Sequence, residues 1–245
     1  MKIYSPWAEI DNSGAIALNP RLDTLEGKTI GLYAHFKGHS PIMLQVIADL
    51  LLERFPTAKF KSIQLKVDTA EAVNIPEFDA ELKEWLKDVD GVITAYGDMG
   101  SCCMFHAYNT AYVERLGKPT VMLCHEDLIS VGKKGASVRQ CPNLRFVTTT
   151  LPDMSWFPAI DDGVINGMMR PAFAAVLDQI IEGLTKPLTE EEKTPVIRSN
   201  SEAMPFEVES LDGISDLFYK RGWTTGWPII APTEEAVENM LRGTD

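Results

Sequence analysis

Short apolar strands that alternate with amphipathic helices are the feature that most constrains this fold. Residues 91–96 form a β-branched and apolar run, which is typical of a strand buried on both faces of a parallel sheet. Right-handed crossovers join such strand–helix units into one sheet. The pattern predicts a three-layer α/β fold with a mostly parallel sheet, Rossmann-like or flavodoxin-like, and a C-terminal extension. The expected strands lie at 29–34, 59–67, 91–96, 120–124 and 145–150, and the expected helices at 41–55, 78–88, 102–116, 128–138 and 163–184.

The composition changes after the last predicted helix. Residues 186–205 are charged and contain proline, so we expect a linker between an α/β domain at 1–185 and an extension at 206–245. Within the extension, Thr233 is followed by two glutamates, which predicts a helix capped by its side chain. The extension is too small to fold alone. We therefore expect it to pack on a neighbouring domain or on a partner subunit of a homo- or hetero-oligomer.

The charge balance limits the classes of partner. The chain has 23 Lys and Arg against 35 Asp and Glu, a net charge of −12, which disfavours nucleic acid and anionic membranes as partners. No apolar run is long enough to span a bilayer, and the first residues lack the apolar segment of a secretory signal. Four cysteines in 245 residues do not make a disulfide framework. We expect a cytoplasmic protein that binds a small-molecule substrate.

The segment 96–106, YGDMGSCCMFH, carries most of the candidate chemistry. It follows the most apolar strand and opens a helix, and ligands of open α/β sheets bind at the carboxyl ends of the strands. Gly97 and Gly100 would let the backbone approach a ligand closely, and Ser101 is the expected N-cap. Cys102 and Cys103 then lie in the first turn, where backbone amides and the helix dipole favour a thiolate. The segment predicts a reactive thiol at Cys102, with the amides of 100–103 binding an anionic group.

Several polar residues could move protons for this thiol. Cys102, His106 and Asn109 recur at i, i+4 and i+7, on one face of the helix, so His106 is a candidate proton shuttle with Asn109 beside it. His125, directly after the fourth strand, is the alternative shuttle. Asp98 is a candidate acid or base, or a residue that only caps the turn.

A second segment at the same edge follows the first strand. His35 and Lys37, together with the helix start at Ser40, could bind an anionic substrate, although an ordinary strand–helix loop explains them equally well. The cysteines and histidines match no closed zinc spacing, and neither a dinucleotide fingerprint nor a Walker A sequence is present. We therefore expect no cofactor and no metal. For Cys103, Cys124 and Cys141 a role as small core residues is favoured over catalysis.

The run 97–121, GDMGSCCMFHAYNTAYVERLGKPTV, resembles the signature of the UGSC-motif (seleno)protein family, and residues 18–56 are similar to that family's opening strand and helix. The resemblance covers about residues 18–185 and implies an α/β thiol or selenol protein. Met99 stands at the family's selenocysteine or cysteine position, so no redox pair can form between Met99 and Cys102. Residues 221–241 are similar to the start of a further domain in longer relatives, which implies part of a larger or heteromeric enzyme.

Together these features predict an enzyme, or the catalytic subunit of one, that acts on a small organic molecule. Cys102 would perform covalent chemistry at a carbon–heteroatom bond, as in a lyase, a hydrolase or an oxidoreductase with a nucleophilic cysteine. Three alternatives stay open. They are a thiol redox protein related to selenoprotein reductases, a non-catalytic subunit of a heteromeric enzyme, and a metal-dependent lyase or hydratase.

Overall fold

The computed structural model describes residues 2–4, 14–67, 69–154, 157, 159–196, 206–208 and 213–244. The chain divides into two units. The larger unit is Asn12–Ile197, and the smaller unit combines Met1–Asp11 with Arg198–Asp245. Each unit has its own core, and the two are described separately.

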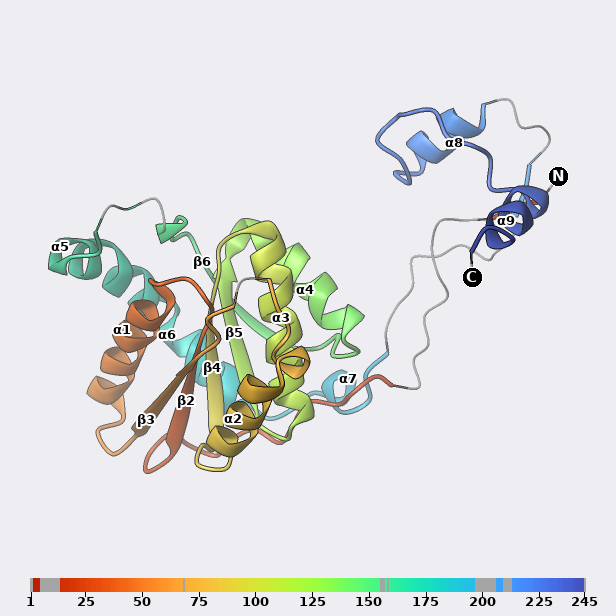
Figure 1. Ribbon diagram of the computed structural model, residues 1–245. Coiled ribbons are helices and arrows are strands. Elements are labelled where there is room, and N and C mark those ends of the chain that lie inside the picture. The colour runs from red at the N-terminus through yellow and green to blue at the C-terminus, as the bar shows by residue number, and fades with distance from the viewer. Residues whose placement is uncertain are drawn as a thin grey trace. The chain divides into compact units, whose positions relative to one another are not determined.

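The larger unit contains a five-stranded sheet in which all paired strands run parallel (Figure 1). The strand order is β3-β2-β4-β5-β6. This arrangement confirms the predicted α/β fold with a mostly parallel sheet. The strands are β2 (Thr29–Ala34), β3 (Lys59–Gln64), β4 (Gly91–Gly97), β5 (Thr120–His125) and β6 (Arg145–Thr149).

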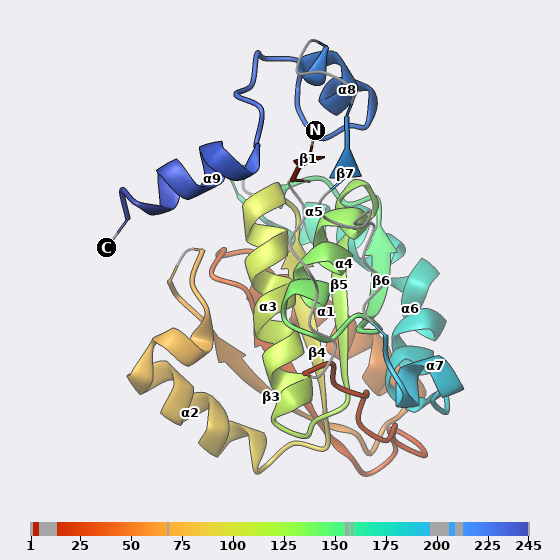
Figure 2. The same cartoon turned by 90° about the vertical axis from the view of Figure 1, so that its right-hand side faces the viewer.

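Helices cover both faces of this sheet, which makes the three expected layers (Figure 2). The helices α1 and α6 pack on one face, and α2, α3 and α4 pack on the other. All seven residues of β4 are buried, in agreement with the apolar run at 91–96. The helices are α1 (Ser40–Arg54), α2 (Pro76–Leu86), α3 (Gly100–Arg115), α4 (Ile129–Val138) and α6 (Arg170–Thr185).

The helix expected at 163–184 is divided in the structure. A short helix α5 (Asp162–Val164), capped by the side chain of Asp161, leads into a π-helical turn at Ile165–Met169, and α6 follows. Pro171 lies in the first turn of α6. Proline lacks a backbone N–H, so it starts a helix more easily than it continues one. The expectation of one regular helix was therefore wrong at this point.

The stretch expected as a linker contains a helical turn, α7 (Glu190–Lys193). Thr189 and Glu192 form a capping box, in which each side chain accepts a hydrogen bond from the other residue's backbone N–H. A Thr-x-x-Glu sequence is the usual signature of such a helix start. The charged segment therefore contains a helix start that its composition alone does not predict.

The smaller unit is built from both ends of the chain. Strand β1 (Lys2–Ile3) pairs antiparallel with β7 (Phe206–Glu207), and Ile3 packs with residues of α8 (Ile214–Lys220). Helix α9 (Glu234–Leu241) begins after Thr233, whose side chain accepts a hydrogen bond from the N–H of Ala236, as expected. The first residues thus group with the extension and not with the α/β unit. Among the described residues, no helix has the length and apolar character needed to cross a membrane.

Candidate functional site

The order of the strands creates a crevice at one edge of the sheet. From β2 the chain crosses to β3 on one side, whereas β4, on the other side of β2, leads on to β5. The loops that leave β2 and β4 therefore diverge, and ligands of open α/β sheets bind at such a switch point, beyond the carboxyl ends of the strands. The first loop carries Lys37 and His39, and the second carries Asp98.

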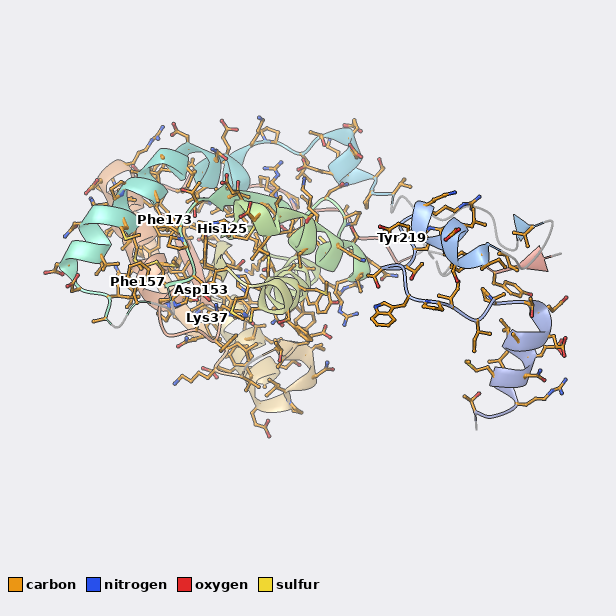
Figure 3. The ribbon with its side chains drawn as sticks, turned by 90° about the horizontal axis from the view of Figure 1, so that it is seen from above. Lys37, His125, Asp153, Phe157, Phe173 and Tyr219 are labelled. Carbon is orange, nitrogen blue, oxygen red and sulfur yellow. The ribbon has the colours of Figure 1, made fainter. Side chains whose placement is uncertain are left out.

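These three side chains form a buried ion network. Asp98 accepts a hydrogen bond at Oδ1 from Nζ of Lys37 (2.6 Å), and its Oδ2 lies 2.8 Å from Nε2 of His39. The loop after β6 adds Asp153, whose Oδ2 lies 3.1 Å from the same Lys37 Nζ (Figure 3). The Asp98 side chain has no exposed surface, and those of His39 and Lys37 are 3 % and 6 % exposed. Two carboxylates thus share one ammonium group away from bulk water.

The protonation of this network follows from its contacts. Burial lowers the pKa of the Lys37 ammonium, but its hydrogen bonds to Asp98 and Asp153 and their charges outweigh burial, so the pKa lies above its ordinary value. An ionised carboxylate can only accept hydrogen bonds, so Nε2 of His39 carries the proton that faces Asp98. His39 Nδ1 is then the ring atom that can accept a proton.

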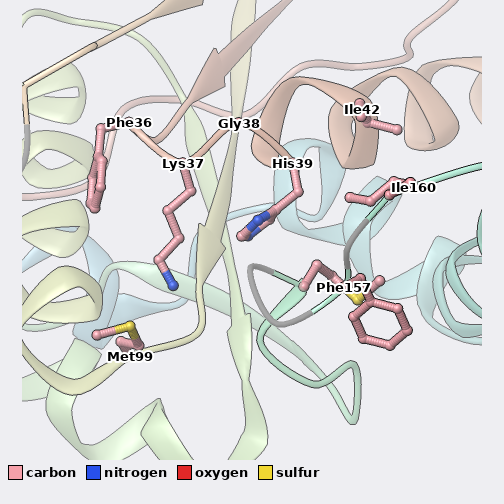
Figure 4. Close-up of a pocket in the computed structure, with 10 residues that line it drawn as sticks. Phe36, Lys37, Gly38, His39, Ile42, Met99, Phe157 and Ile160 are labelled. Atoms are coloured by element: carbon pink, nitrogen blue, oxygen red, sulfur yellow. The ribbon is translucent and has the colours of Figure 1, made fainter.

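The network borders a cavity of about 650 Å³. Lys37 and His39 extend into it from one side, with Met99 and Phe157 across from them (Figure 4). The other lining residues supply mainly apolar surface, and the described set is Phe36, Lys37, Gly38, His39, Ile42, Met99, Met154, Phe157, Ala159 and Ile160. Ligand pockets of enzymes combine an apolar wall with a few placed polar groups, and this cavity has that character.

The sequence identified part of this site. It predicted Lys37 and Asp98 at the carboxyl edge, and the structure brings them into direct contact. His39 lies in the same loop as Lys37 but was not among the predicted site residues, and Asp153 was missed. Asp153 follows the end of β6 at Thr149 by four residues, so the same rule about strand ends would have found it.

The first turn of α3 differs from the expectation. Met99 occupies the N-cap position, and Ser101 lies inside the helix with its side chain exposed, so the prediction that Ser101 caps α3 was wrong. The helix starts two residues earlier than a serine cap requires, because the N–H of Cys103 already bonds the carbonyl of Met99 (2.7 Å). The Cys103 amide therefore bonds within the helix and cannot bind the anionic group that was expected at the amides of 100–103. Gly100, the first of those residues, is also the first residue of the helix and is exposed.

Cys103 and Gly97 lie in the core beneath this turn. A Cβ atom added to Gly97 would lie 2.8 Å from Sγ of Cys103 and 3.1 Å from Cβ of Cys124, so only glycine fits there. A hydrogen bond with Cys124 and burial raise the pKa of the Cys103 thiol. The close approach that the sequence predicted at Gly97 therefore occurs, but with core cysteines.

Cys102 lies near the cavity but does not line it among the residues described. Its exposed fraction is 3 %, and it follows Met99, which is 45 % exposed and does line the cavity, by three residues. Met99 is the N-cap residue of α3 and has an extended backbone, and Cys102 lies in the first turn of the helix that follows it.

His106 and Asn109, the two residues of α3 that were expected to assist Cys102, instead make contacts that stabilise the fold. The ring of His106 is fully buried, hydrogen-bonds the backbone of Thr94, and lies 5.1 Å from the ring of His35. Burial lowers the pKa of His106 to about 3 and that of His35 to about 2, so both are neutral at physiological pH and poor proton acceptors. The Asn109 amide accepts from the N–H of Ala72 (2.7 Å) and donates to the carbonyl of Ala70 (2.9 Å). Asn109 thus anchors a neighbouring loop.

His125 ends β5 as expected, but its Nδ1 accepts a hydrogen bond from the N–H of Asp127 (3.2 Å). This contact caps the short helical turn Glu126–Leu128. The structure describes His125 as half-buried and does not place it among the cavity residues. Of the four histidines, all of which the structure describes, His39 is the one that contacts a carboxylate and also lines the cavity.

Comparison with known protein families supports this part of the chain as a family domain. The model of the UGSC family matches residues 2–159, a range that contains β2 to β6 together with Lys37, Asp98, Cys102 and Asp153. No curated protein and no solved structure matched the chain.

Proposed function

The chain belongs to the UGSC family, and we propose that it is an enzyme that cleaves a carbon–heteroatom bond of a small organic molecule bound in the switch-point cavity. The observation that carries the proposal is the buried network of Lys37, His39 and Asp98 at the border of that cavity. Burying charged groups is costly, and networks that do so beside a cavity are typical of catalytic sites.

In this proposal His39 moves the proton. Asp98 accepts the hydrogen bond from Nε2 and thereby holds the ring orientation and tautomer, which leaves Nδ1 as the base. Lys37 stays protonated, pairs with Asp98, and supplies positive charge for an oxygen that becomes negative in the transition state. His39 thus takes the role that the sequence suggested for His106 or His125.

Cys102 is the proposed nucleophile. It lies in the first turn of α3, where the helix dipole favours a thiolate, and Met99, the N-cap residue of the same helix, borders the cavity. A rotation of the Met99 side chain would open a path from the cavity to the thiol. His39 would take the thiol proton, and the thiolate would bond to the electrophilic carbon. The leaving group would then depart with that proton, and water would hydrolyse the new carbon–sulfur bond.

Reaction with p-nitrophenyl acetate tests this proposal. We expect release of p-nitrophenolate and an acetyl adduct on Cys102, detected by intact-protein mass spectrometry and peptide mapping. Cys102→Ser should abolish the adduct, and His39→Gln should slow acylation by about 10²-fold or more, the usual share of general base catalysis. Met99→Ala should speed it by opening the path to the thiol.

Cys141→Ser is the matched control, because burial raises the pKa of that thiol to about 12 and it lies outside the cavity lining. This variant should react as the wild-type protein does. An adduct that persists in Cys102→Ser, or a rate that His39→Gln leaves unchanged, would contradict the proposed roles.

A partner-binding role is a second candidate. In the smaller unit Trp227, Ile230 and Met240 are 78 %, 89 % and 74 % exposed. Exposed apolar side chains are typical of protein interaction sites where they are contiguous, as Ile230 and Met240 are in lining one pocket, and this supports the expected homo- or hetero-oligomer. Size-exclusion chromatography with light scattering, on wild type and on Ile230→Asp, tests it. A monomer in both samples at high concentration, with and without the proteins co-expressed with it, would contradict it.

A cytoplasmic location belongs to the same set of proposals, since no disulfide joins the four cysteines, all of which are described.

A further inference from the structure

The switch-point network also has the composition of a metal site. His39, Asp98 and Asp153 each offer a ligand atom, and these atoms all lie within 4.8 Å of one another. They come from three separate loops, after β2, β4 and β6, which the parallel sheet brings to one edge. An imidazole nitrogen with two carboxylate oxygens is a ligand set that divalent transition metals accept.

The structure already holds a cationic group at this position. Lys37 Nζ lies 2.6 Å from Asp98 Oδ1 and 3.1 Å from Asp153 Oδ2, so the two carboxylates converge on one positive charge. Without a cation, two carboxylates this close and this buried would repel each other. The ammonium is the end of a flexible four-carbon side chain, and Lys37 lines the cavity, so it has space into which it can withdraw.

We propose that His39, Asp98 and Asp153 bind a divalent transition-metal ion, such as Zn²⁺ or Mn²⁺, which displaces the Lys37 ammonium into the cavity. With two ionised carboxylates and one ammonium the network carries a charge of −1, and the added ion changes that charge to +1. Three protein ligands leave a coordination position open, as in catalytic metal sites. The ion would polarise a carbonyl or other oxygen of a ligand in the cavity, and the released Lys37 would attract a negatively charged group on the same molecule.

This site uses other residues than the cysteines and histidines of the 96–106 segment and of the end of β5, although Cys102, Cys103, His106 and His125 are also residue types that bind metals. The structure engages Cys103 with Cys124, His106 with the backbone of Thr94, and His125 with the N–H of Asp127. The ion would use His39 and Asp98, to which the proposal above assigns proton transfer, so a bound ion and that role of His39 exclude each other, whereas Cys102 is not one of the three ligands.

Titration calorimetry with Zn²⁺ and with Mn²⁺, on full-length protein freed of metal with a chelator, tests the proposal. We expect one ion per chain. Asp153→Asn removes a ligand and should weaken binding by at least about tenfold, in line with the sensitivity of metal sites to their ligands and ligand supports. Lys37→Met keeps the length of the side chain and removes the competing charge, so it should bind more tightly than the wild-type protein.

Asp23→Asn is the matched control, because it makes the same change on a side chain that is 82 % exposed, and it should bind as the wild-type protein does. Cys102→Ser should also leave binding unchanged, which separates this result from the proposed nucleophile. Co²⁺ provides a spectroscopic check, since nitrogen and oxygen ligands give visible d–d bands without the thiolate-to-metal charge-transfer band that a cysteine ligand adds.

The proposal is overturned if Asp153→Asn binds the ions as tightly as the wild-type protein, or if Lys37→Met binds no more tightly than it. Should Lys37→Met fail to fold, the comparison of Asp153→Asn with Asp23→Asn in the presence of Lys37 decides the question. Circular dichroism of each variant establishes that it is folded before titration.

Discussion

Helix α3 joins two buried ion networks at opposite ends of the same sheet. At its C-terminal end the Glu114 carboxylate accepts hydrogen bonds from Arg21 Nη2 (2.7 Å), from the backbone N–H of Asn19 (3.0 Å) and from that of Thr120 (2.7 Å). Before its first turn the Asp98 carboxylate meets the ionisable groups of Lys37 and His39. Both carboxylate side chains are fully buried.

The two networks differ in the groups that hydrogen-bond to their central carboxylates. Glu114 bonds to backbone groups from two distant segments, so its charge holds the chain before β2 against the start of β5. Asp98 bonds only to side chains among its described contacts, and those side chains border a cavity at the switch point. A buried ion pair by itself is therefore weak evidence for a site. Access to a ligand and partners that can titrate are the features that distinguish the functional network.

The largest expected effect is on the network at the C-terminal end of α3. Glu114→Ala leaves Arg21, whose side chain is 1 % exposed, as an uncompensated charge, and should lower the free energy of unfolding by about 3–5 kcal/mol. Urea unfolding followed by circular dichroism measures it. Glu182→Ala is the control, because its pair with Lys186 is exposed and should contribute about 1 kcal/mol or less. Equal losses in the two variants would mean that burial does not govern these pairs.

Asp98→Asn should destabilise the chain less. The variant keeps a polar side chain of the same size, and Lys37 retains its contact with Asp153, so we expect a loss of about 1–3 kcal/mol in urea unfolding. Esterase activity in the p-nitrophenyl acetate assay should fall at the same time, because His39 loses the carboxylate that orients it. A variant as unstable as Glu114→Ala but fully active would reverse the roles assigned to the two networks.

His106 lies on α3 between the two networks and gives a smaller, pH-dependent effect. Burial lowers its pKa to about 3, so the folded chain keeps it neutral while the unfolded chain binds a proton below about pH 6.5. The stability that depends on neutral His106 is complete above pH 6.5 and is lost as the pH falls towards 3. At pH 5.5 the loss should be about 1 kcal/mol.

His106→Leu should remove that part of the pH dependence. Urea unfolding of wild type and variant at pH 7.5 and 5.5 measures it, with the difference between the two pH values as the readout. The absolute stability of the variant does not enter this comparison. Parallel changes in both proteins would show that His106 does not titrate on unfolding as its burial indicates.

The sequence predicted the sheet better than the site because strands depend on local pattern. The apolar run at 91–96 forms β4, buried at every position, and the other four strands of the large sheet lie close to their expected ranges. The rule about strand ends also brought Lys37 and Asp98 to the correct edge. Local sequence pattern cannot predict which side chains from different loops contact one another at that edge.

The contacts of Asp153 and Asn109 show this limit. Asp153 reaches Lys37 from more than a hundred residues away, and only the completed sheet brings them together. Asn109 was assigned to the face of Cys102 and His106 from helical spacing, but its amide holds residues 70 and 72, which no periodicity connects to α3. Helical spacing gives the side of a helix and not the partner that covers it.

Gly97 determines which wall of the cavity can change. Its contact with Cys103 and Cys124 presses the end of β4 directly against the first turn of α3, and only Asp98 and Met99 connect the two elements. Because this connection is so short, the Asp98 carboxylate keeps its position whatever ligand is present. Adaptation to a larger or smaller molecule must come from the opposite wall, through substitutions at Phe36, Ile42 or Ile160. Engineering of ligand preference should therefore begin at those three positions and leave the glycine intact.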